Sequence, residues 1–584
     1  MVTEKSLLTL KFRDIFRGAK ETFRKDLKTW LLKFLKSNCQ SQLLLTVGPG
    51  SPATPASASI SLSTHCVLNL ELFVAGRNSC SWSELYGEHG WYSVIVQPGP
   101  LGQNESGLLC TFRKDRDPQN GYIPLVVAAS LFVAVILLYF LGLYVSKLRC
   151  TQDLYHLFQH KCFPGLFNHA SEPQIPAHVP PEEPRKKRLL SLDTFRGLSL
   201  TLMVFVNYGG GGYWFFEHAP WNGLTIADLV MPWFVFILGT SVGLAFHVMR
   251  RKGVKKVQLF RKVAWRTGVL IAIGVLFLNY GPADGPLSWS WARLPGVLQR
   301  LGFTYFIVAL MQIAFGVADI QRYQVGVWWA PFRDIVLYWQ EWIIITGLEC
   351  IWLCLTFLLP VPGCPRGYLG PGGIGDDGKY FNCTGGAAAY IDKWILGENH
   401  LYRFPSCKEL YKTTQPFDPE GILGTINSII MAFFGLQAGK IILMYRSKPR
   451  SILKRFLIWS VLLGIISAIL TLGTQNEGFI PVNKNLWSLS FVTTTSCFSF
   501  ILLGLLYYVI DMKGWWSGCP LIYPGMNSIL VYVGHSLLGS YFPFSWEMKS
   551  PTSHTEPLAQ DLLGTAIWVF IAFLLFRKNI FLKI

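Results

Sequence analysis

Two side chains suited to acid–base or acyl-transfer chemistry lie on either side of four consecutive glycines. Asn207 supplies an amide and His218 supplies an imidazole, with the glycine run beginning at Gly209 between them. The stretch separates two apolar segments that are each long enough to cross a membrane. Irregular backbone and an ionisable ring are tolerated at membrane depth only inside protein or beside a wet cavity. This loop is therefore the first candidate for chemistry.

The glycines Gly209, Gly210 and Gly211 can adopt positive φ and carry no side chain, so their N–H groups could point at a ligand. They do not form a phosphate-binding P-loop, because no Gly-Lys-Ser/Thr sequence follows them. A flexible luminal turn is the alternative interpretation. The neighbouring amide and imidazole favour a functional loop instead.

The imidazole of His218 has an ordinary pKa near ~6.5, which suits proton transfer in a mildly acidic compartment. Its aromatic neighbours Phe215, Phe216 and Trp221 support a competing interpretation, in which the ring only packs at the membrane interface. Asn207 could orient this ring or donate a hydrogen bond to a developing oxyanion. Because Asn207 and the glycine loop lie close to it in the sequence, we interpret His218 as the catalytic group.

Thr225 and Asp228 have the spacing of a capping box at the start of the next apolar segment, with Thr at N-cap and Asp at N3. This gives Asp228 a structural role. The alternative role is catalytic, because the positive end of the helix dipole points back toward His218 and could stabilise an oxyanion. Asp228 therefore joins Asn207 and His218 as a candidate catalytic residue.

Membrane-spanning helices must position these residues. Of the 584 residues, 51% are hydrophobic, and apolar runs long enough to cross a bilayer of ~30 Å recur from Ile123 onward. The predicted fold is a polytopic α-helical membrane protein with about 11 transmembrane helices and a small N-terminal luminal β domain. The predicted spans are 123–145, 190–208, 226–247, 263–280, 301–318, 342–360, 422–444, 456–474, 488–510, 519–540 and 561–576.

Two independent signals give the orientation. Lys and Arg gather in the loops after the first, third and seventh predicted spans, and such basic loops stay on the cytosolic side. The opposite side holds residues 1–122 and the loop 361–421. Each contains an Asn-x-Ser/Thr glycosylation signal, at Asn104 and Asn382. Both signals predict a luminal N-terminus and a cytosolic C-terminus.

The chain divides by composition. Residues 39–122 alternate apolar and polar residues between Gly, Pro and Ser clusters, which predicts a luminal β-rich domain. Residues 1–38 form an atypical basic N-terminus without a clean signal-peptide core, so either the first span, 123–145, inverts the domain unaided or this start is incomplete or mis-assigned. A Pro- and charge-rich cytosolic linker, 146–189, then precedes a ten-helix transmembrane domain, 190–584.

The net charge of +18 is explained by cytosolic loops that face the anionic lipids of the bilayer. A nucleic-acid partner is not required. The same basic clusters could also recruit a polyanionic nucleotide cofactor, although lipid is the larger expectation because basic cytosolic loops occur in nearly every polytopic protein.

Three of the ionisable residues inside predicted spans are weaker candidates. Lys440 lies near the cytosolic end of its span, where it either snorkels to the headgroups or contacts a cofactor phosphate. Glu349 lies deep in an apolar run and requires a partner or a water cavity. His535 lies near the luminal end of its span and is expected to be interfacial.

Charged residues on the luminal side are candidates for substrate binding. Arg293 and Arg300 could bind carboxylate or sulfate through the guanidinium fork, or could instead tie loops to helix C-termini. Lys484, Asp418 and Glu420 lie where a sugar could meet them, and they rank below His218.

The cysteines agree with an oxidising luminal side, where disulfides persist. Their pairing cannot be chosen from sequence. No Cys-x-x-Cys pair has the spacing of zinc ligands, so no metal site is expected. The cysteines concerned are Cys39, Cys66, Cys80 and Cys110 before the first span and Cys364, Cys383 and Cys407 in the long luminal loop.

Seven short motifs stand out after the linker: Ser191-Leu-Asp-Thr-Phe-Arg-Gly197, Val204-Phe-Val-Asn-Tyr-Gly-Gly-Gly211, His218-Ala-Pro-Trp-Asn-Gly-Leu-Thr225, Arg293-Leu-Pro-Gly-Val-Leu-Gln-Arg300, the Gly- and Pro-rich run from Pro362 to Asp376, Asp418-Pro-Glu-Gly421 and Pro481-Val-Asn-Lys-Asn-Leu-Trp487. Together they resemble the heparan-alpha-glucosaminide N-acetyltransferase family of lysosomal transmembrane enzymes. The resemblance runs from about residue 190 to residue 584, is weaker over the luminal β domain, and is lost over residues 1–38.

The resemblance implies transfer of acetyl from cytosolic acetyl-CoA to the terminal α-D-glucosamine of heparan sulfate, across the lysosomal membrane. The active-site histidine of the family falls on His218 and its neighbouring Asn on Asn207. His218 would act as a base on the glucosamine amine or would carry the acetyl group covalently. The oligomeric state stays open, with a homodimer as one arrangement.

Under this interpretation the acetyl donor would contact the glycine loop and Lys440. The sugar would contact Arg293, Arg300, Lys484 and Glu420. A secondary transporter of a small anionic metabolite is the rival hypothesis, because broken helices and charges near the membrane midplane also occur there.

Overall fold

The structure is a computed structural model that describes residues 5–12, 30–35, 42–47, 57–63, 68–74, 77–84, 86–98, 108–146, 188–279, 288–316, 332–550 and 553–582. Within these residues the chain is mostly helical, and its named strands all lie before residue 117. The predicted fold class is therefore confirmed in its coarse form, a membrane-type helical protein with a small sheet region near the N-terminus.

Eight strands form two four-stranded sheets, in the orders β4-β1-β7-β8 and β3-β2-β5-β6. Only the β1–β7 pair is parallel. The sheets include residues 5–12 and 30–35, so the β region begins earlier than the boundary predicted at residue 39. The strands are β1 Lys5–Phe12, β2 Trp30–Leu35, β3 Gln42–Val47, β4 Ser57–Ser63, β5 Leu68–Val74, β6 Arg77–Glu84, β7 Trp91–Pro98 and β8 Leu108–Arg116.

A second unit, of which the structure describes residues 120–146 and 188–189, contains helix α2, Ile123–Ser146. Its 24 residues include no charged side chain, and at 1.5 Å per residue they are long enough to cross the hydrocarbon core of a bilayer. This helix occupies the first predicted span.

Helix is present at each of the other ten predicted spans. Among the described residues, seven helices are both long and apolar enough to cross a membrane, so the finer prediction of eleven crossings is not established. The helices are α4 Leu190–Tyr208, α5 Ile226–Arg251, α6 Lys256–Ile273, α7 Val297–Phe315, α9 Trp339–Leu358, α12 Ile422–Met444, α13 Pro449–Thr471, α14 Leu489–Leu506, α15 Ile522–Met526, α16 Ser528–Leu538 and α17 Thr555–Arg577; all but α4, α6, α15 and α16 belong to the seven.

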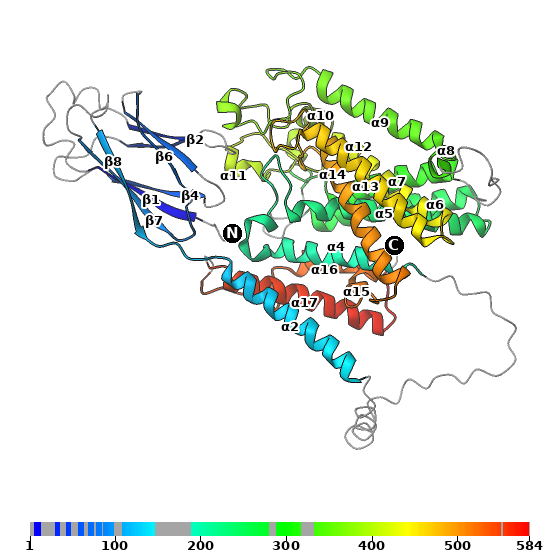
Figure 1. Ribbon diagram of the computed structural model, residues 1–584. Helices are drawn as coiled ribbons and strands as arrows, with labels where there is room; N and C mark the ends of the chain where they lie inside the picture. The colour runs from blue at the N-terminus through cyan, green and yellow to red at the C-terminus, as the bar shows by residue number, and fades with distance from the viewer. Residues whose placement is uncertain are drawn as a thin grey trace. The chain divides into compact units, whose positions relative to one another are not determined.

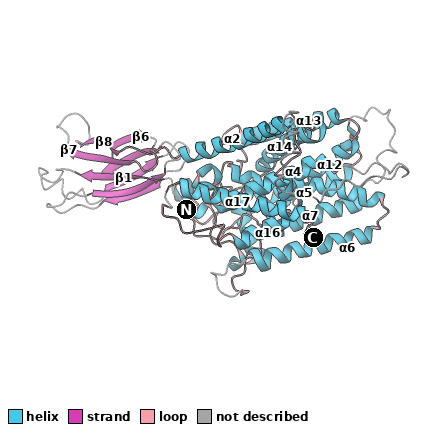
Figure 2. Ribbon diagram, turned by 90° about the horizontal axis from the view of Figure 1, so that it is seen from below, coloured by secondary structure: helices cyan, strands magenta, loops and turns pink. Residues whose placement is uncertain are grey.

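Helices α5 and α12 pack along each other in the interior of this helical region (Figures 1 and 2). In the most apolar stretch of each helix, 89% of the residues of α12 are buried, whereas only 22% of those of α9 are buried. Glycines allow the close contact, because a Cβ on Gly239 would lie 1.8 Å from the Ala432 carbonyl oxygen and one on Gly435 would lie 1.9 Å from that of Phe236. The α5–α12 pair therefore forms a closely packed centre, and other helices pack against it.

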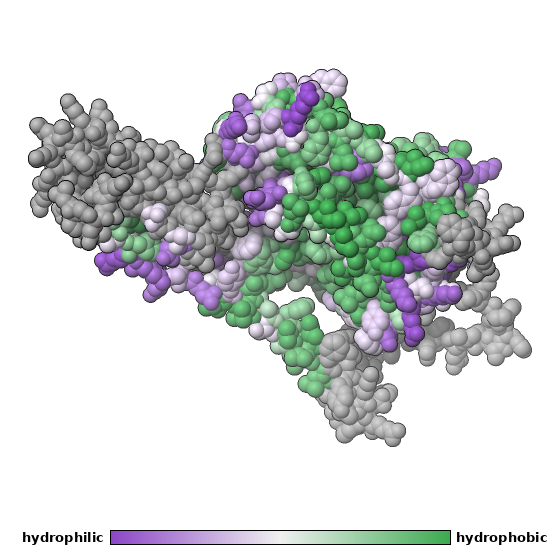
Figure 3. Space-filling model, turned by 45° about the horizontal axis from the view of Figure 1, so that its top comes forward, coloured by the Kyte–Doolittle hydropathy of each residue, from purple (hydrophilic) through white to green (hydrophobic). Residues whose placement is uncertain are grey.

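Hydrophobic residues cover most of the visible face of the helical region, and hydrophilic residues gather mainly at its margins (Figure 3). On α13, for example, Leu457, Ile458, Val461 and Ile465 are all more than half exposed. Exposed apolar surface of this extent is stable in lipid but not in water. The chain is accordingly a multi-pass membrane protein.

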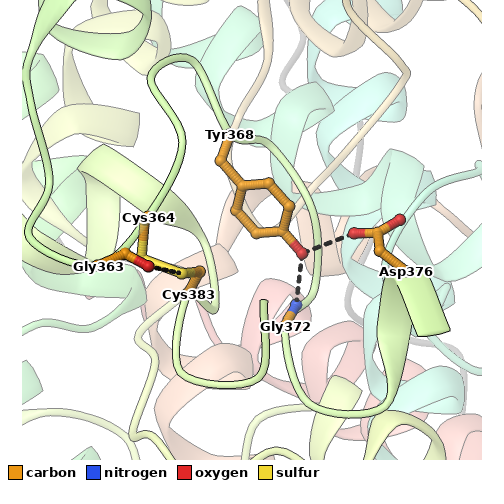
Figure 4. Close-up of a disulfide and its surroundings, with 6 residues drawn as sticks. All are labelled: Gly363, Cys364, Tyr368, Gly372, Asp376 and Cys383. Carbon is orange, nitrogen blue, oxygen red and sulfur yellow. Dashed lines mark hydrogen bonds between the residues drawn. A yellow bond between two sulfur atoms is a disulfide. The ribbon is translucent and has the colours of Figure 1, made fainter. Parts of the chain in front are cut away.

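The long connection between α9 and α12 has its own short helices, α10 Gly386–Leu396 and α11 Cys407–Tyr411. A disulfide joins Cys364 to Cys383, and nearby the Tyr368 hydroxyl donates to Asp376 at 2.8 Å (Figure 4). The pairing that sequence left open is thus settled for these two cysteines, and Cys407 is free and buried. Of the two predicted glycosylation positions, Asn382 is exposed and Asn104 lies outside the described residues.

Candidate active site

His218 lies in the loop between α4 and α5, directly beside the first turn of α5. Its Nδ1 is 2.9 Å from Oδ1 of Asp228, which is fully buried. Because a carboxylate can only accept, Nδ1 carries the proton, and Nε2 is left with its lone pair. The His218 side chain is 41% exposed, so this nitrogen is open to a reactant. An accessible imidazole held by a buried carboxylate is an arrangement suited to a base or a nucleophile.

The second carboxylate oxygen of Asp228, Oδ2, caps the first turn of helix α5. Oδ2 accepts from the backbone N–H of Thr225 at 3.1 Å, from the Thr225 hydroxyl at 3.0 Å and from the N–H of Ala219 at 3.2 Å. These bonds satisfy backbone donors that have no partner in the helix. One carboxylate thus serves both the first turn of α5, through Oδ2, and His218, through Oδ1.

The surroundings of His218 keep its ring neutral. The surrounding protein removes water from part of the ring, which lowers the pKa of His218 below its usual value. The nearby positive charge of Lys484 lowers it further, while the bond to Asp228 partly opposes both effects. Lys484 Nζ lies 3.8 Å from Asp228 Oδ1. A ring that stays neutral under mildly acidic conditions remains available as a base.

A distant part of the chain fixes the loop that carries His218. Asn222 and Asn483 form an antiparallel bridge, and the Asn483 amide also donates to Oδ1 of Asn222 at 3.0 Å. The N–H of Gly223 donates to the Val482 carbonyl at 2.9 Å. This short ladder places Lys484, from the loop before α14, next to the histidine and its carboxylate.

Arg293, predicted to bind substrate, is engaged in an internal ion cluster. Its guanidinium donates to both carboxylate oxygens of Asp418, at 2.7 and 2.8 Å, and to Glu420 at 2.5 Å. Burial alone would raise the pKa of Glu420, but Arg293, Arg300 and Lys484 lower it overall. Glu420 is therefore ionised, and it acts electrostatically on His218 as well. The guanidinium of Arg293 is thus occupied by Asp418 and Glu420, and its predicted contact with a substrate anion stays a prediction.

Arg300 lies on the first turn of α7 and is 2% exposed. It donates to the Gly421 carbonyl at 3.0 Å and stacks over the Trp487 ring at 4.9 Å. These contacts tie α7 to the start of α12. Arg300 therefore has a structural role in joining helix ends. The structure thus brings His218, Asp228, Lys484, Glu420, Arg293 and Arg300 together at one end of the helices.

Asn207 has a different partner from the one expected. Its amide Nδ2 lies 2.9 Å from Nε2 of His535 on α16, and no hydrogen bond joins it to His218 among the described contacts. Nδ1 of His535 lies 3.0 Å from the Val531 carbonyl, so the neutral ring donates there and accepts from Asn207. His535, expected to be interfacial, is buried at 2% exposure.

The glycine loop packs against α17. All four glycines have positive φ, and the N–H of Gly211 donates to Asp561 Oδ2 at 2.8 Å. The N–H of Gly209 is bound to the Val206 carbonyl at 3.1 Å. A Cβ on Gly211 would lie 2.9 Å from Leu558. The N–H groups of Gly209 and Gly211 are therefore used inside the protein, and the predicted contact of Gly209, Gly210 and Gly211 with a cofactor stays a prediction.

Lys440 is buried and does not snorkel to the headgroups, and its predicted contact with a cofactor stays a prediction. It is 2% exposed, pairs with Glu341 of α9 and lies 3.7 Å from the centre of the Tyr338 ring. Burial in the helical interior explains the difference, because a lysine there is stable only beside a countercharge. Glu349, by contrast, has no protein partner for either carboxylate oxygen among the described residues.

Several residues that shape the site were not singled out by the sequence analysis. Glu341 and Asp561 are acids inside apolar helices, a signal that can be read from sequence. Asn222 and Asn483 each lie in one of the conspicuous motifs, but nothing in the sequence shows that these two motifs pair.

Two curated relatives match this chain over nearly its whole length. It is 48% identical over 563 residues to the Mus musculus heparan-alpha-glucosaminide N-acetyltransferase, covering 94% of this chain and 85% of the relative. The Homo sapiens protein of the same name is 48% identical over 565 residues, covering 94% and 84%. The chain belongs to the heparan-alpha-glucosaminide N-acetyltransferase family. No protein-family profile matches it.

As a member of the heparan-alpha-glucosaminide N-acetyltransferase family, the chain is an acyltransferase. The match to these relatives extends well beyond residues 190–584, which carried the resemblance in the sequence.

Replacing Lys484 by Gln is expected to move the acidic limb of the kcat/KM profile to higher pH. Lys484 lowers the pKa of His218, so its loss raises that pKa, and the ring becomes protonated at a higher pH. Lys393→Gln is the matched control, because this lysine is paired with Glu398 at the surface. An unchanged acidic limb in Lys484→Gln would contradict the assignment of His218 as the titrating base.

Proposed function

We propose that this acyltransferase acetylates the terminal glucosamine of heparan, with acetyl-CoA as the donor. The names of the two relatives support the acceptor, since both are heparan-alpha-glucosaminide N-acetyltransferases. The observation that carries the mechanism is the 2.9 Å contact between His218 Nδ1 and Asp228, which leaves an accessible Nε2. We place the enzyme in the lysosomal membrane, with its N-terminus luminal and its C-terminus cytosolic.

His218 would act on the acceptor amine. A glucosamine amine must be neutral to attack a thioester, and an acidic lumen keeps most of it protonated. As the amine nitrogen bonds to the acetyl carbonyl carbon, Nε2 takes the amine proton. The carbon–sulfur bond then breaks, and CoA leaves as a thiolate that the imidazolium proton neutralises to the free thiol. Asp228 holds the ring in the required tautomer and stabilises the imidazolium that forms, as the buried carboxylate does in Ser-His-Asp enzymes.

The same nitrogen also suits covalent transfer, in which Nε2 takes the acetyl group and then passes it to the amine. Both routes need a neutral Nε2, and the lowered pKa of His218 favours that form. Rapid quenching followed by mass spectrometry of the peptide that contains His218 separates them: an added acetyl group supports the covalent route, and its absence during turnover supports direct transfer.

Helix α5 connects two regions of different chemistry. Asp228 lies in its first turn, and its other end leads to the exposed basic residues Arg251, Lys252, Lys255 and Lys256. Twenty-six residues at ~1.5 Å each give a length of roughly 39 Å, enough to cross a bilayer. The basic cluster suits either lipid headgroups or the phosphates of the donor. This separation supports a donor that arrives from one face and a sugar that arrives from the other.

Sealed vesicles that contain the purified protein test the function. Labelled acetyl-CoA is supplied on one side and a glucosamine acceptor is enclosed on the other. Acetylated sugar inside supports the proposal. Intact labelled acetyl-CoA inside, without sugar product, would instead establish the transporter. Vesicles without protein serve as the control for leakage.

A further inference from the structure

A cavity of about 270 Å³ lies beside the glycine loop, between the end of α4, the end of α16 and the start of α17. Its wall includes Asn207, His535, Ser540, Ser545, Gln560 and Phe544. A cavity needs only ~10–15 Å³ to hold one water molecule, so this one can hold a much larger guest. Its position at the ends of α4 and α16 places it on the side of the membrane that also carries the loop with His218.

Several polar groups in the wall have no protein partner among the described contacts. Gln560 is 7% exposed, and its Oε1 accepts from the Trp546 N–H at 3.1 Å, which leaves the amide Nε2 with two free hydrogens. Asn207 uses Nδ2 to bind His535 and leaves its Oδ1 free. The hydroxyls of Ser540 and Ser545 make no hydrogen bond inside the protein. The cavity thus offers donors and acceptors at fixed positions.

The described residues that line the cavity include no Asp, Glu, Lys or Arg. His535 is neutral because it donates to Val531 and accepts from Asn207. Phosphate, sulfate and carboxylate groups would find no countercharge here, and burying them would be costly. Hydroxyl groups match the free amides and serines, and Phe544, stacked on Trp568 at 5.1 Å, gives the wall an apolar face. A ring that is rich in hydroxyl groups and free of anionic groups is the chemistry that fits.

Electrostatic contacts connect this cavity to the site of His218. The ring of His535 lies 5.5 Å from that of Tyr532, one turn earlier on α16. Tyr532 interacts electrostatically with Glu420 and Arg293, and Glu420 in turn acts on His218. Tyr532 therefore lies next to His535 of the cavity wall and within electrostatic range of the ion cluster beside His218.

We propose that this cavity is a sugar-binding pocket, in which Asn207, Gln560, Ser540 and Ser545 hold the hydroxyl groups of the acceptor ring. His535 is a positioning residue that orients the Asn207 amide. The proposal rests on the function proposed above, since it assigns the place of the same acceptor.

The test uses the full-length protein, with methyl α-D-glucosaminide as the acceptor and acetyl-CoA as the donor. Gln560→Leu and the double variant Ser540→Ala/Ser545→Ala are each expected to raise the acceptor KM roughly fivefold while the donor KM stays unchanged. The double variant removes hydroxyls that the fold does not use, so it tests the pocket even if Gln560→Leu fails to fold. Gln258→Leu, an exposed amide on α6, is the matched control.

An unchanged acceptor KM in the double variant, or a rise in the donor KM instead, would overturn the pocket. Equilibrium dialysis of labelled methyl α-D-glucosaminide without a donor separates this failure from failure of the function. If the wild type binds the sugar and the double variant does not, but no acetyl is transferred, the pocket stands and the acetylation proposal falls. If neither protein retains the sugar, the pocket falls.

Discussion

Replacing His218 by Ala is expected to lower kcat by about 10²- to 10⁴-fold with little change in folding, because proton transfer by a positioned side chain contributes about that much. The His218 side chain is 41% exposed, and among the described residues its hydrogen-bond partner is Asp228. Asp228 keeps its bonds to Thr225 and Ala219 after the change, so α5 retains its first turn. Single-turnover acetylation and thermal melting in detergent measure the two effects.

Two comparisons make the His218 result decisive. His400→Ala removes a histidine of the connection between α9 and α12, which is bound to the Ala292 carbonyl at 2.7 Å, and is expected to keep turnover close to wild type. Added imidazole is expected to restore part of the activity of His218→Ala, because the vacated position is open to solvent. Normal turnover in His218→Ala would refute the assignment. A strongly lowered melting temperature would show that the residue is structural.

Removing either member of the Glu341–Lys440 pair is expected to destabilise the protein by about 3–5 kcal/mol, because the remaining charge stays buried and unpaired. The two side chains are at most 2% exposed and join α9 to α12. Gln312 also donates to Glu341 at 2.8 Å, so Lys440→Met leaves a carboxylate with only a neutral partner. Melting in detergent of Lys440→Met and Glu341→Met measures the loss.

The double variant Glu341→Met/Lys440→Met is expected to recover much of that stability, because two apolar side chains of similar volume leave no buried charge. The exposed pair Lys393–Glu398 is the matched control, with side chains 47% and 50% exposed, and its loss should cost at most about 1 kcal/mol. Equal effects at the buried and the exposed pair would show that burial of the Lys440 charge is not what matters.

Helix positions were predictable from the sequence because lipid imposes a simple rule. A segment that crosses hydrocarbon must be apolar over about 20 residues and must satisfy its own backbone. Helix therefore occupies every predicted span, and the start of α5 follows from Thr225 and Asp228. The rule is weaker for a helix packed inside protein: α4 carries Asp193 and Arg196, and its composition falls short of a membrane span by itself.

Partner choice was less predictable, because it depends on which helices become neighbours. The sequence correctly marked His218 and Asp228 as neighbours, since only ten residues separate them. It could not show that Asn207 meets His535, 328 residues away, or that Lys440 meets Glu341, 99 residues away. Arg293 shows the same effect, since the acids that occupy its guanidinium lie in a motif more than 120 residues later.

The bridge between Asn222 and Asn483 has a consequence for how the enzyme matures. The imidazole takes up its working position only after a segment made more than 250 residues later has been synthesised, inserted and docked. A nascent or truncated chain that ends before that segment carries every atom of the histidine yet lacks its anchor. The site is therefore complete only after synthesis has passed Asn483 and that segment has docked against the loop that carries His218.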